Sequence, residues 1–186
     1  GHGASAGVID SDGRTPLIHA SSAGVAELVD LLLRAGADPE HEDRSRWTAL
    51  TEAAFQGHAD IVGTLAPLGP KSLDRALHLA CVSGDVSTVG ALLQEGASVF
   101  ARSSEDKTAL MYAAANGHLS TAKLLIRNGA NRFAIDGRER TASELAREAG
   151  YPEVATFLGE PPTEDDRDPA AALFVLTIEP AVGDDP

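Results

Sequence analysis

The sequence predicts an all-α repeat solenoid, in which antiparallel helix pairs stack side by side and loops or short β-hairpins project from the stack. Three observations predict this fold. A short motif returns five times along the chain, glycines stand at two fixed distances after it, and only 4% of the residues are aromatic. A fixed internal period is typical of repeat architectures. A composition poor in aromatics but rich in alanine and leucine suits thin helices packed closely on copies of themselves.

The repeat is defined by a first position and two glycines. The first positions, separated by 33, 27, 33 and 33 residues, are Thr15, Thr48, Arg75, Thr108 and Thr141. A glycine follows nine residues later in each unit, at Gly24, Gly57, Gly84, Gly117 and Gly150. Twelve residues further on, a second glycine stands in four of the five units, at Gly36, Gly69, Gly96 and Gly129. Agreement at two internal offsets indicates a genuine repeat.

Each unit is expected to hold two short helices. The opening threonine caps the first helix through its hydroxyl, and Pro16 suits a first turn where no amide donor is needed. The first glycine then ends this helix by allowing a left-handed backbone. The second helix carries an apolar stripe, for example Leu28, Leu31 and Leu32, before the second glycine ends it. Because neither helix is long enough to be stable alone, stability is expected from stacking on neighbours.

Several of these landmarks resemble the ankyrin-repeat family. They are Thr15-Pro16-Leu17 followed by Ala20, the pairs Gly57-His58 and Gly117-His118, and the run Leu31 to Asp38. The resemblance covers about residues 10–159. It implies an L-shaped stack with ligands on the concave side, against the first helices and the hairpin tips. It also implies that His58, His78 and His118 make structural hydrogen bonds between backbone segments.

The 27-residue interval departs from this pattern. In other units the next first position comes twelve residues after the second glycine, whereas Arg75 comes only six residues after Gly69. This length is too short for a projecting hairpin, and Pro67 is expected to shorten or kink the second helix. We therefore predict a tight turn that leaves a notch in the row of hairpins. A functionally neutral loop deletion is the alternative, since loops tolerate length changes.

The ends of the chain differ from the repeats. Residues 1–9 are expected to be a flexible leader left from expression, and residues 10–159 form the repeat array with polar terminal units. Residues 160–186 form a tail with eight acids and one arginine around an apolar segment, 170–178. The tail either folds back on the array, pairs with a partner by strand addition, or is a disordered or expression-derived end. The residues of its interaction segment are Leu173, Phe174, Val175, Leu176 and Ile178, and part of it resembles a SUMO-interacting motif.

The composition argues against several functions. A formal charge of −13 argues against binding to nucleic acid or anionic membranes, and no apolar run approaches the length of a membrane span. The single cysteine, Cys81, forms no internal disulfide, so a cytoplasmic protein is expected, with a nuclear location as the alternative. No phosphate-binding loop or nucleophile–base set is found, and His41-Glu42-Asp43 is a poor preformed metal site. We therefore expect no enzyme activity, cofactor or metal.

A binding surface is predicted from exposed positions of the first helices. The predicted binding residues are three apolar side chains that stacking does not require, three hairpin arginines and the tryptophan at a hairpin base: Phe55, Val82, Tyr112, Arg44, Arg46, Arg102 and Trp47. Tryptophan at this position is also structural filler in ankyrin repeats, so a structural role is the alternative for Trp47. Grouped exposed apolar residues suggest an interaction surface, although the arginines also suit solvated tips. The expected function is a non-catalytic scaffold or adaptor that binds a protein, a peptide or the chain's own tail. The alternatives are a regulatory ankyrin module of a larger enzyme or channel, and an effector or inhibitor protein.

Overall fold

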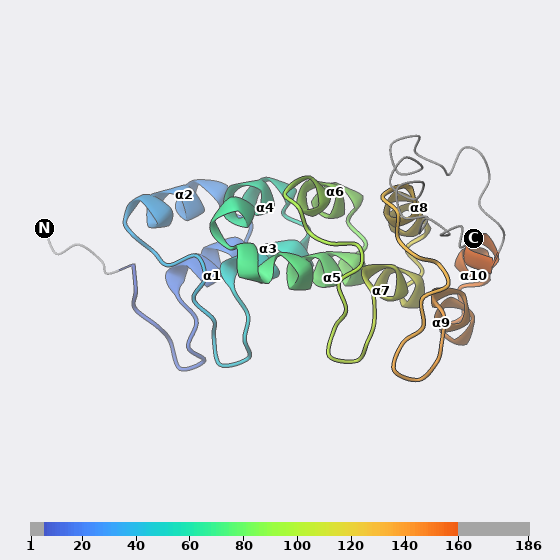
Figure 1. Ribbon diagram of the computed structural model, residues 1–186. Coiled ribbons are helices and arrows are strands. Elements are labelled where there is room, and N and C mark those ends of the chain that lie inside the picture. The colour runs from blue at the N-terminus through green and yellow to red at the C-terminus, as the bar shows by residue number, and fades with distance from the viewer. Residues whose placement is uncertain (1–5, 160–186) are drawn as a thin grey trace, which may run out of the picture.

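The computed structural model describes residues 6–159 (Figure 1). The α-helices are α1 (Pro16–Ser22), α2 (Ala26–Arg34), α3 (Ala49–Gln56), α4 (Ala59–Leu65), α5 (Leu73–Ser83), α6 (Val86–Gln94), α7 (Ala109–Ala115), α8 (Leu119–Arg127), α9 (Ala142–Glu148) and α10 (Pro152–Gly159). Two 3-10 turns, η1 (Ala66–Leu68) and η2 (Pro70–Ser72), lie between α4 and α5. The odd-numbered helices form an inner row and the even-numbered helices an outer row, which confirms the predicted all-α solenoid of antiparallel pairs.

The opening threonines cap the inner helices as the sequence predicts. The hydroxyl of Thr48 accepts a hydrogen bond from the backbone N–H of Thr51, and Thr15, Thr108 and Thr141 make the equivalent bond. In the third unit Arg75 has no such role, because α5 already begins at Leu73. The capped start is therefore a property of four units, and the third unit starts its inner helix in another way.

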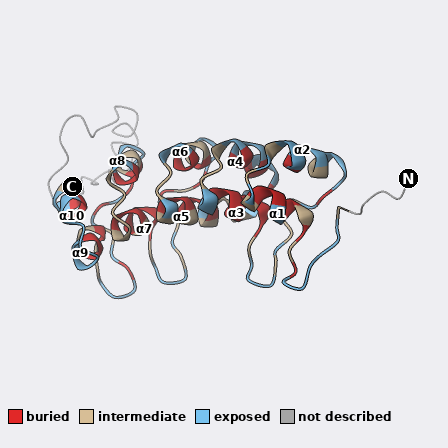
Figure 2. Ribbon diagram, turned by 180° about the vertical axis from the view of Figure 1, so that it is seen from behind, coloured by how far each residue is buried: buried red, intermediate tan, exposed pale blue. Residues whose placement is uncertain are grey.

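The core lies between the two rows of helices (Figure 2). It is filled by one leucine from each of α1, α3, α5 and α7 and by apolar residues of the outer helices, while alanines allow the inner helices to approach one another. Its inner leucines are Leu17, Leu50, Leu77 and Leu110, all at most 1% exposed. Since these residues come from consecutive units, each unit is stabilised mainly by its neighbours.

The projecting loops share one turn. A side chain at the same repeat position accepts backbone N–H groups two and four residues later; these side chains are Asp10, Asp43, Ser103 and Asp136. Three residues further along, the backbone has a positive φ of 59–81°, at Gly13, Arg46, Asp106 and Glu139. Within residues 6–159 the loops contain no named strand, only an isolated bridge between Ile135 and Thr141. The shape of the hairpins is therefore fixed by these side-chain hydrogen bonds at their tips and by the helices on either side.

The third unit lacks this hairpin. Helix α4 ends at Leu65, before Pro67, and the two 3-10 turns lead directly into α5. Gly69 has a φ of −126°, whereas every other repeat glycine lies in the left-handed region. At 11 residues, α5 is also the longest α-helix of the described chain. The predicted notch is present, and the missing hairpin is replaced partly by 3-10 turns and partly by an extended helix.

The two ends of the array are unlike. At the C-terminal end Glu144, Arg147 and Glu148 are exposed, as expected for a polar cap. In the first unit Leu28 is 43% exposed, although Ile61 and Val154 at the equivalent position of later units are buried. Within residues 6–159, the expected polar outer face is therefore found at the C-terminal end, while the first unit exposes an apolar side chain.

Candidate functional site

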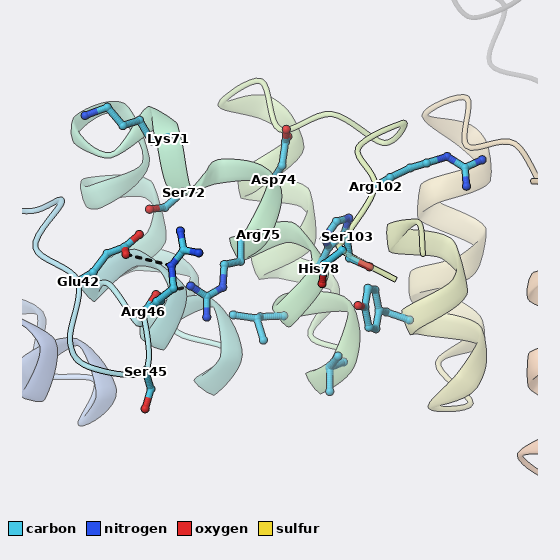
Figure 3. Close-up of a pocket in the computed structure, with 14 residues that line it drawn as sticks. Glu42, Ser45, Arg46, Lys71, Ser72, Asp74, Arg75, His78, Arg102 and Ser103 are labelled. Atoms are coloured by element: carbon cyan, nitrogen blue, oxygen red, sulfur yellow. Dashed lines mark hydrogen bonds and ion pairs between the residues drawn. The ribbon is translucent and has the colours of Figure 1, made fainter. Parts of the chain in front are cut away.

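The notch forms a hollow of about 590 Å³ on the inner row (Figure 3). One wall is the hairpin segment 42–46, the opposite wall is the segment 102–104, and α5 forms the floor together with Tyr112 of α7. On the floor, Asp74, His78 and Val82 follow one another at intervals of four residues, so they share one helical face. The hollow thus results directly from the six-residue deletion, which removes a hairpin and lets α5 run on beneath the gap.

An aromatic pair lies beside the first wall. The rings of Trp47 and Phe55 meet edge to face with centroids 5.6 Å apart, and the guanidinium carbon of Arg75 lies 5.8 Å from the Trp47 ring centroid. Arg75 also donates a hydrogen bond to the carbonyl oxygen of Arg46. Phe55 remains 37% exposed. The missing hairpin therefore leaves an arginine of α5 stacked on the tryptophan of the preceding unit.

A second aromatic contact crosses the floor toward α7. The rings of His78 and Tyr112 have centroids 5.3 Å apart, and the Lys107 ammonium lies 5.7 Å from the Tyr112 ring centroid. His78 is only 8% exposed, and its Nε2 donates to the carbonyl oxygen of Ala101 at 3.2 Å. Burial lowers the pKa of His78 below its usual value, because the charged ring loses water. This histidine supports the second wall.

The charge of the hollow differs from that of the chain. Four cationic residues line it (Arg46, Lys71, Arg75 and Arg102), against the two carboxylates of Glu42 and Asp74. Arg46 pairs with Glu42 at 3.3 Å, and Lys71 pairs with Glu40 at 2.7 Å. Within residues 6–159 neither Arg75 nor Arg102 has a carboxylate partner within 4.0 Å. A surplus of positive charge in a chain of −13 suits an acidic ligand.

The structure brings most of the predicted binding residues together. Val82, Tyr112, Arg46 and Arg102 line the hollow, and Trp47 and Phe55 lie beside it. Arg102 is fixed, since its Nη1 donates to the carbonyl oxygens of Asp106 at 2.8 Å and Ile135 at 2.7 Å. Arg44 does not line the hollow. Its backbone N–H instead donates to the carbonyl oxygen of Asp12 at 3.0 Å.

Sequence reasoning missed ten of the fourteen residues that line the hollow, including two on its floor. These two are Arg75, which the repeat pattern places at a helix start, and Leu79, which the sequence analysis does not single out. The available signal was the arginine that replaces the capping threonine in this unit alone. The predicted tail residues, Leu173 to Ile178, lie outside the described residues.

The histidines shared with the repeat pattern hold backbone segments together. Nε2 of His58 donates to the carbonyl oxygen of Ser22 at 3.3 Å, and Nε2 of His118 donates to that of Val82 at 2.9 Å. Cys81 is buried, which raises the pKa of its thiol. Across the described part of the chain, no group of three His, Cys, Asp or Glu side chains is placed to hold a metal ion. None of its helices is long and apolar enough to cross a membrane.

These features define a helical repeat protein with an open hollow on its inner row. A family model for ankyrin repeats, in three copies, matches residues 2–76 and again residues 77–167. The chain therefore belongs to the ankyrin-repeat family, whose arrays generally bind protein partners and are generally not catalytic.

Comparison with known proteins also finds individual relatives. The chain is 34% identical over 110 residues to a Caenorhabditis elegans homolog of transient receptor potential cation channel subfamily A member 1. This match covers 55% of this chain and 9% of that protein. It is 38% identical over 101 residues to ankyrin repeat and SOCS box protein 11 of Danio rerio, with 52% and 34% covered. It is 36% identical over 63 residues to glycerophosphocholine phosphodiesterase gde1 of Schizosaccharomyces pombe, with 32% and 6% covered. The chain thus spans only a part of each relative.

Proposed function

We infer that this chain is a non-catalytic adaptor that binds an extended segment of a partner protein in the hollow between its hairpins. The observation that carries the proposal is the hollow itself, where one hairpin is missing and α5 is left uncovered. A regular array has no such opening, so the deletion gives this chain a binding position of its own. The expected cytoplasmic or nuclear location is part of the proposal.

The lining supports a polypeptide ligand. Leu79, Val82 and Tyr112 offer partly buried apolar surface on the floor, and cationic and hydroxyl side chains stand on the walls. Apolar anchors surrounded by polar groups are typical of interfaces in which a few central residues provide most of the binding energy. Figure 3 shows Arg46 and Arg75 close to one another at the first wall, where they suit a carboxylate-bearing ligand.

A second candidate function is regulation within a larger protein. It is favoured by the similarity to a cation channel homolog and to a phosphodiesterase, each of which is much longer than the matched region. In that case the hollow binds a segment of the protein to which the array is attached. The chemistry of recognition is the same in both cases, so one experiment tests the site for both.

The test is a selection of linear peptides from a display library against the full chain, followed by affinity measurement on variants. Val82→Asp places a charge on the floor of the hollow and is expected to weaken the selected peptides at least about tenfold, the effect of losing one central interface residue. Val86→Asp is the matched control, since Val86 is an exposed valine at the start of α6 in the outer row. An equal loss of peptide affinity in Val82→Asp and Val86→Asp would contradict the proposed site.

A second variant restores the missing hairpin. Residues 70–74 are replaced with a copy of residues 97–107, which adds the six residues that this unit lacks. The hairpin is expected to cover α5 and to abolish binding of the selected peptides, while circular dichroism shows an unchanged helix content. If the refilled array still binds them with the original affinity, the peptides bind elsewhere and the proposal fails.

A further inference from the structure

We propose that the hollow is the docking site for the acidic C-terminal segment of this same chain, residues 164–179. The inference rests on the proposed function, because it uses the same hollow, and it names the occupant. Bound there, the segment occupies the surface that an external ligand needs. The chain would then regulate its own binding surface.

Charge complementarity is the first argument. Residues 160–186 contain eight of the 28 acids of the chain and only one of its 15 bases. Asp165, Asp166 and Asp168 precede the apolar run, and Glu179 follows it directly. The hollow holds four cations against two carboxylates, and two of these cations, Arg75 and Arg102, have no carboxylate partner among the described residues. Opposite charges at close range in a partly enclosed site favour association.

The order of residues in the segment is the second argument. Its acids lie on both sides of a run of large apolar side chains, as the cations of the hollow lie on both sides of an apolar floor. In an extended chain, alternate side chains point the same way. Phe174, Leu176 and Ile178 would therefore lie on one side, opposite the floor formed by Leu79, Val82 and Tyr112.

The length of the connection is the third argument. Helices α9, α7 and α5 are consecutive neighbours in the inner row. Because packed helices lie ~8–10 Å apart, the floor of the hollow is about 16–20 Å along the stack from α9. The thirteen residues 160–172 follow the end of α10, and an extended chain of that length spans up to about 43 Å. The segment can therefore reach the hollow of its own chain.

The experiment measures how strongly the full chain binds a second copy of the segment. The probe is a fluorescein-labelled peptide of residues 164–186, followed by fluorescence anisotropy. In the open variant, Leu176→Asp with Ile178→Asp, the tethered segment is expected to leave the hollow. Its matched control, Ala181→Asp with Val182→Asp, adds the same charge outside the apolar run. All four positions lie outside residues 6–159, the part of the chain that the structure describes.

A tether of this kind gives an effective concentration of ~1 mM. We take a probe that binds the open hollow with a Kd of ~100 μM. If the tethered segment has the same intrinsic affinity, its effective concentration is about ten times this Kd, so the probe is expected to bind the unmodified chain and the control about tenfold more weakly than the open variant. Adding Val82→Asp to the open variant should remove the binding, and raised salt should weaken it. Equal affinity for all three forms, no binding to any form, or binding that survives Val82→Asp would each overturn the proposal.

Two further outcomes separate this proposal from the proposed function. If peptides selected from the library on the open variant lose their affinity with Val82→Asp while the probe does not bind, the hollow is a binding site but not for this segment. If light scattering shows that the unmodified chain is a dimer that the open variant abolishes, the segment docks on a second copy and intramolecular docking is wrong. The inference is supported if the unmodified chain is a monomer and binds the probe about tenfold more weakly than the open variant.

Discussion

Arg75 lies over the indole ring of Trp47, with its guanidinium carbon 5.8 Å from the ring centroid. The two residues belong to different units. In a regular array, a projecting hairpin would occupy the space beside the start of α5. The contact exists because the six-residue deletion lets α5 begin at Leu73 and places its first turn next to the preceding hairpin. It joins the floor of the hollow to the residue that directly follows its first wall.

Replacing Arg75 with alanine is expected to cost about 1–2 kcal/mol of unfolding free energy. The variant loses the cation–π contact with Trp47, worth ~0.5–1 kcal/mol, and the hydrogen bond to the carbonyl oxygen of Arg46, worth about 1 kcal/mol. Urea unfolding followed by tryptophan fluorescence measures both the stability and the environment of the ring. Arg127→Ala, at an exposed position of α8, is the control and should change stability by less than ~0.5 kcal/mol.

Phe55→Ala and Tyr112→Ala should weaken ligand binding more than they weaken the fold. Both side chains are partly exposed, so each truncation is expected to cost at most about 1.5 kcal/mol of stability, whereas Leu110→Ala in the core should cost ~2–5 kcal/mol. Affinity for peptides that bind the hollow should fall about tenfold or more. The measurements are urea unfolding and anisotropy on the same samples. If the free energy of unfolding falls in the first two variants as much as in Leu110→Ala, these residues are structural and the binding surface is wrongly assigned.

Gly84→Ala should destabilise the array more than Gly36→Ala. Both glycines have a left-handed backbone, with φ of 82° and 84°, so each alanine costs about 1–2 kcal/mol of strain. A Cβ at Gly36 meets no atom within 4 Å, whereas a Cβ at Gly84 would lie 2.3 Å from Nδ1 of His118. The histidine must move and lose its hydrogen bond to Val82, which adds about 1 kcal/mol. Equal urea midpoints for the two variants would show that the His118 ring moves aside without lowering the free energy of unfolding.

Asp136 should make the last hairpin sensitive to acid. Its side chain is 1% exposed and accepts the backbone N–H groups of Arg138 and Arg140, along with the guanidinium of Arg140. These hydrogen bonds lower the pKa of Asp136 to about 2, and the bond from the backbone N–H of Arg140 has the largest effect. Because the folded pKa lies below the unfolded one, the stabilisation is complete above the ordinary pKa of 3.8 and is lost as the pH falls toward 2.

The corresponding test compares the full chain with Asp136→Asn across this pH range. The variant is expected to be less stable at pH 7, and the difference should shrink as the pH falls through the window between the two pKa values. Urea midpoints at each pH give the difference directly. Asp30→Asn, at an exposed position in the middle of α2, provides a control that should show no comparable convergence.

Periodic features of the chain could be predicted because they depend on local chemistry. A threonine caps a helix through its own hydroxyl, a left-handed glycine ends one, and alanines at fixed spacing allow helices to approach. The register of Thr48, Gly57 and Gly69 therefore predicted the helix pairs, the family and the position of the missing hairpin. The resemblance to the same family also implied that His58 and His118 join backbone segments, while their particular partners, Ser22 and Val82, come from the structure.

The tertiary structure decided what occupies the position of the missing hairpin. The sequence shows that six residues are absent before Arg75, but not that α5 would extend into the gap, because helix ends depend on the space left by neighbouring elements. The contact of Arg75 with Trp47 and the place of Leu79 in the floor join residues of different units, so no local spacing predicts them. The sequence by itself determined the scaffold and the place where it is interrupted. The stacking of units determined that the interruption is a charged hollow with an apolar floor, since only packing brings those side chains together.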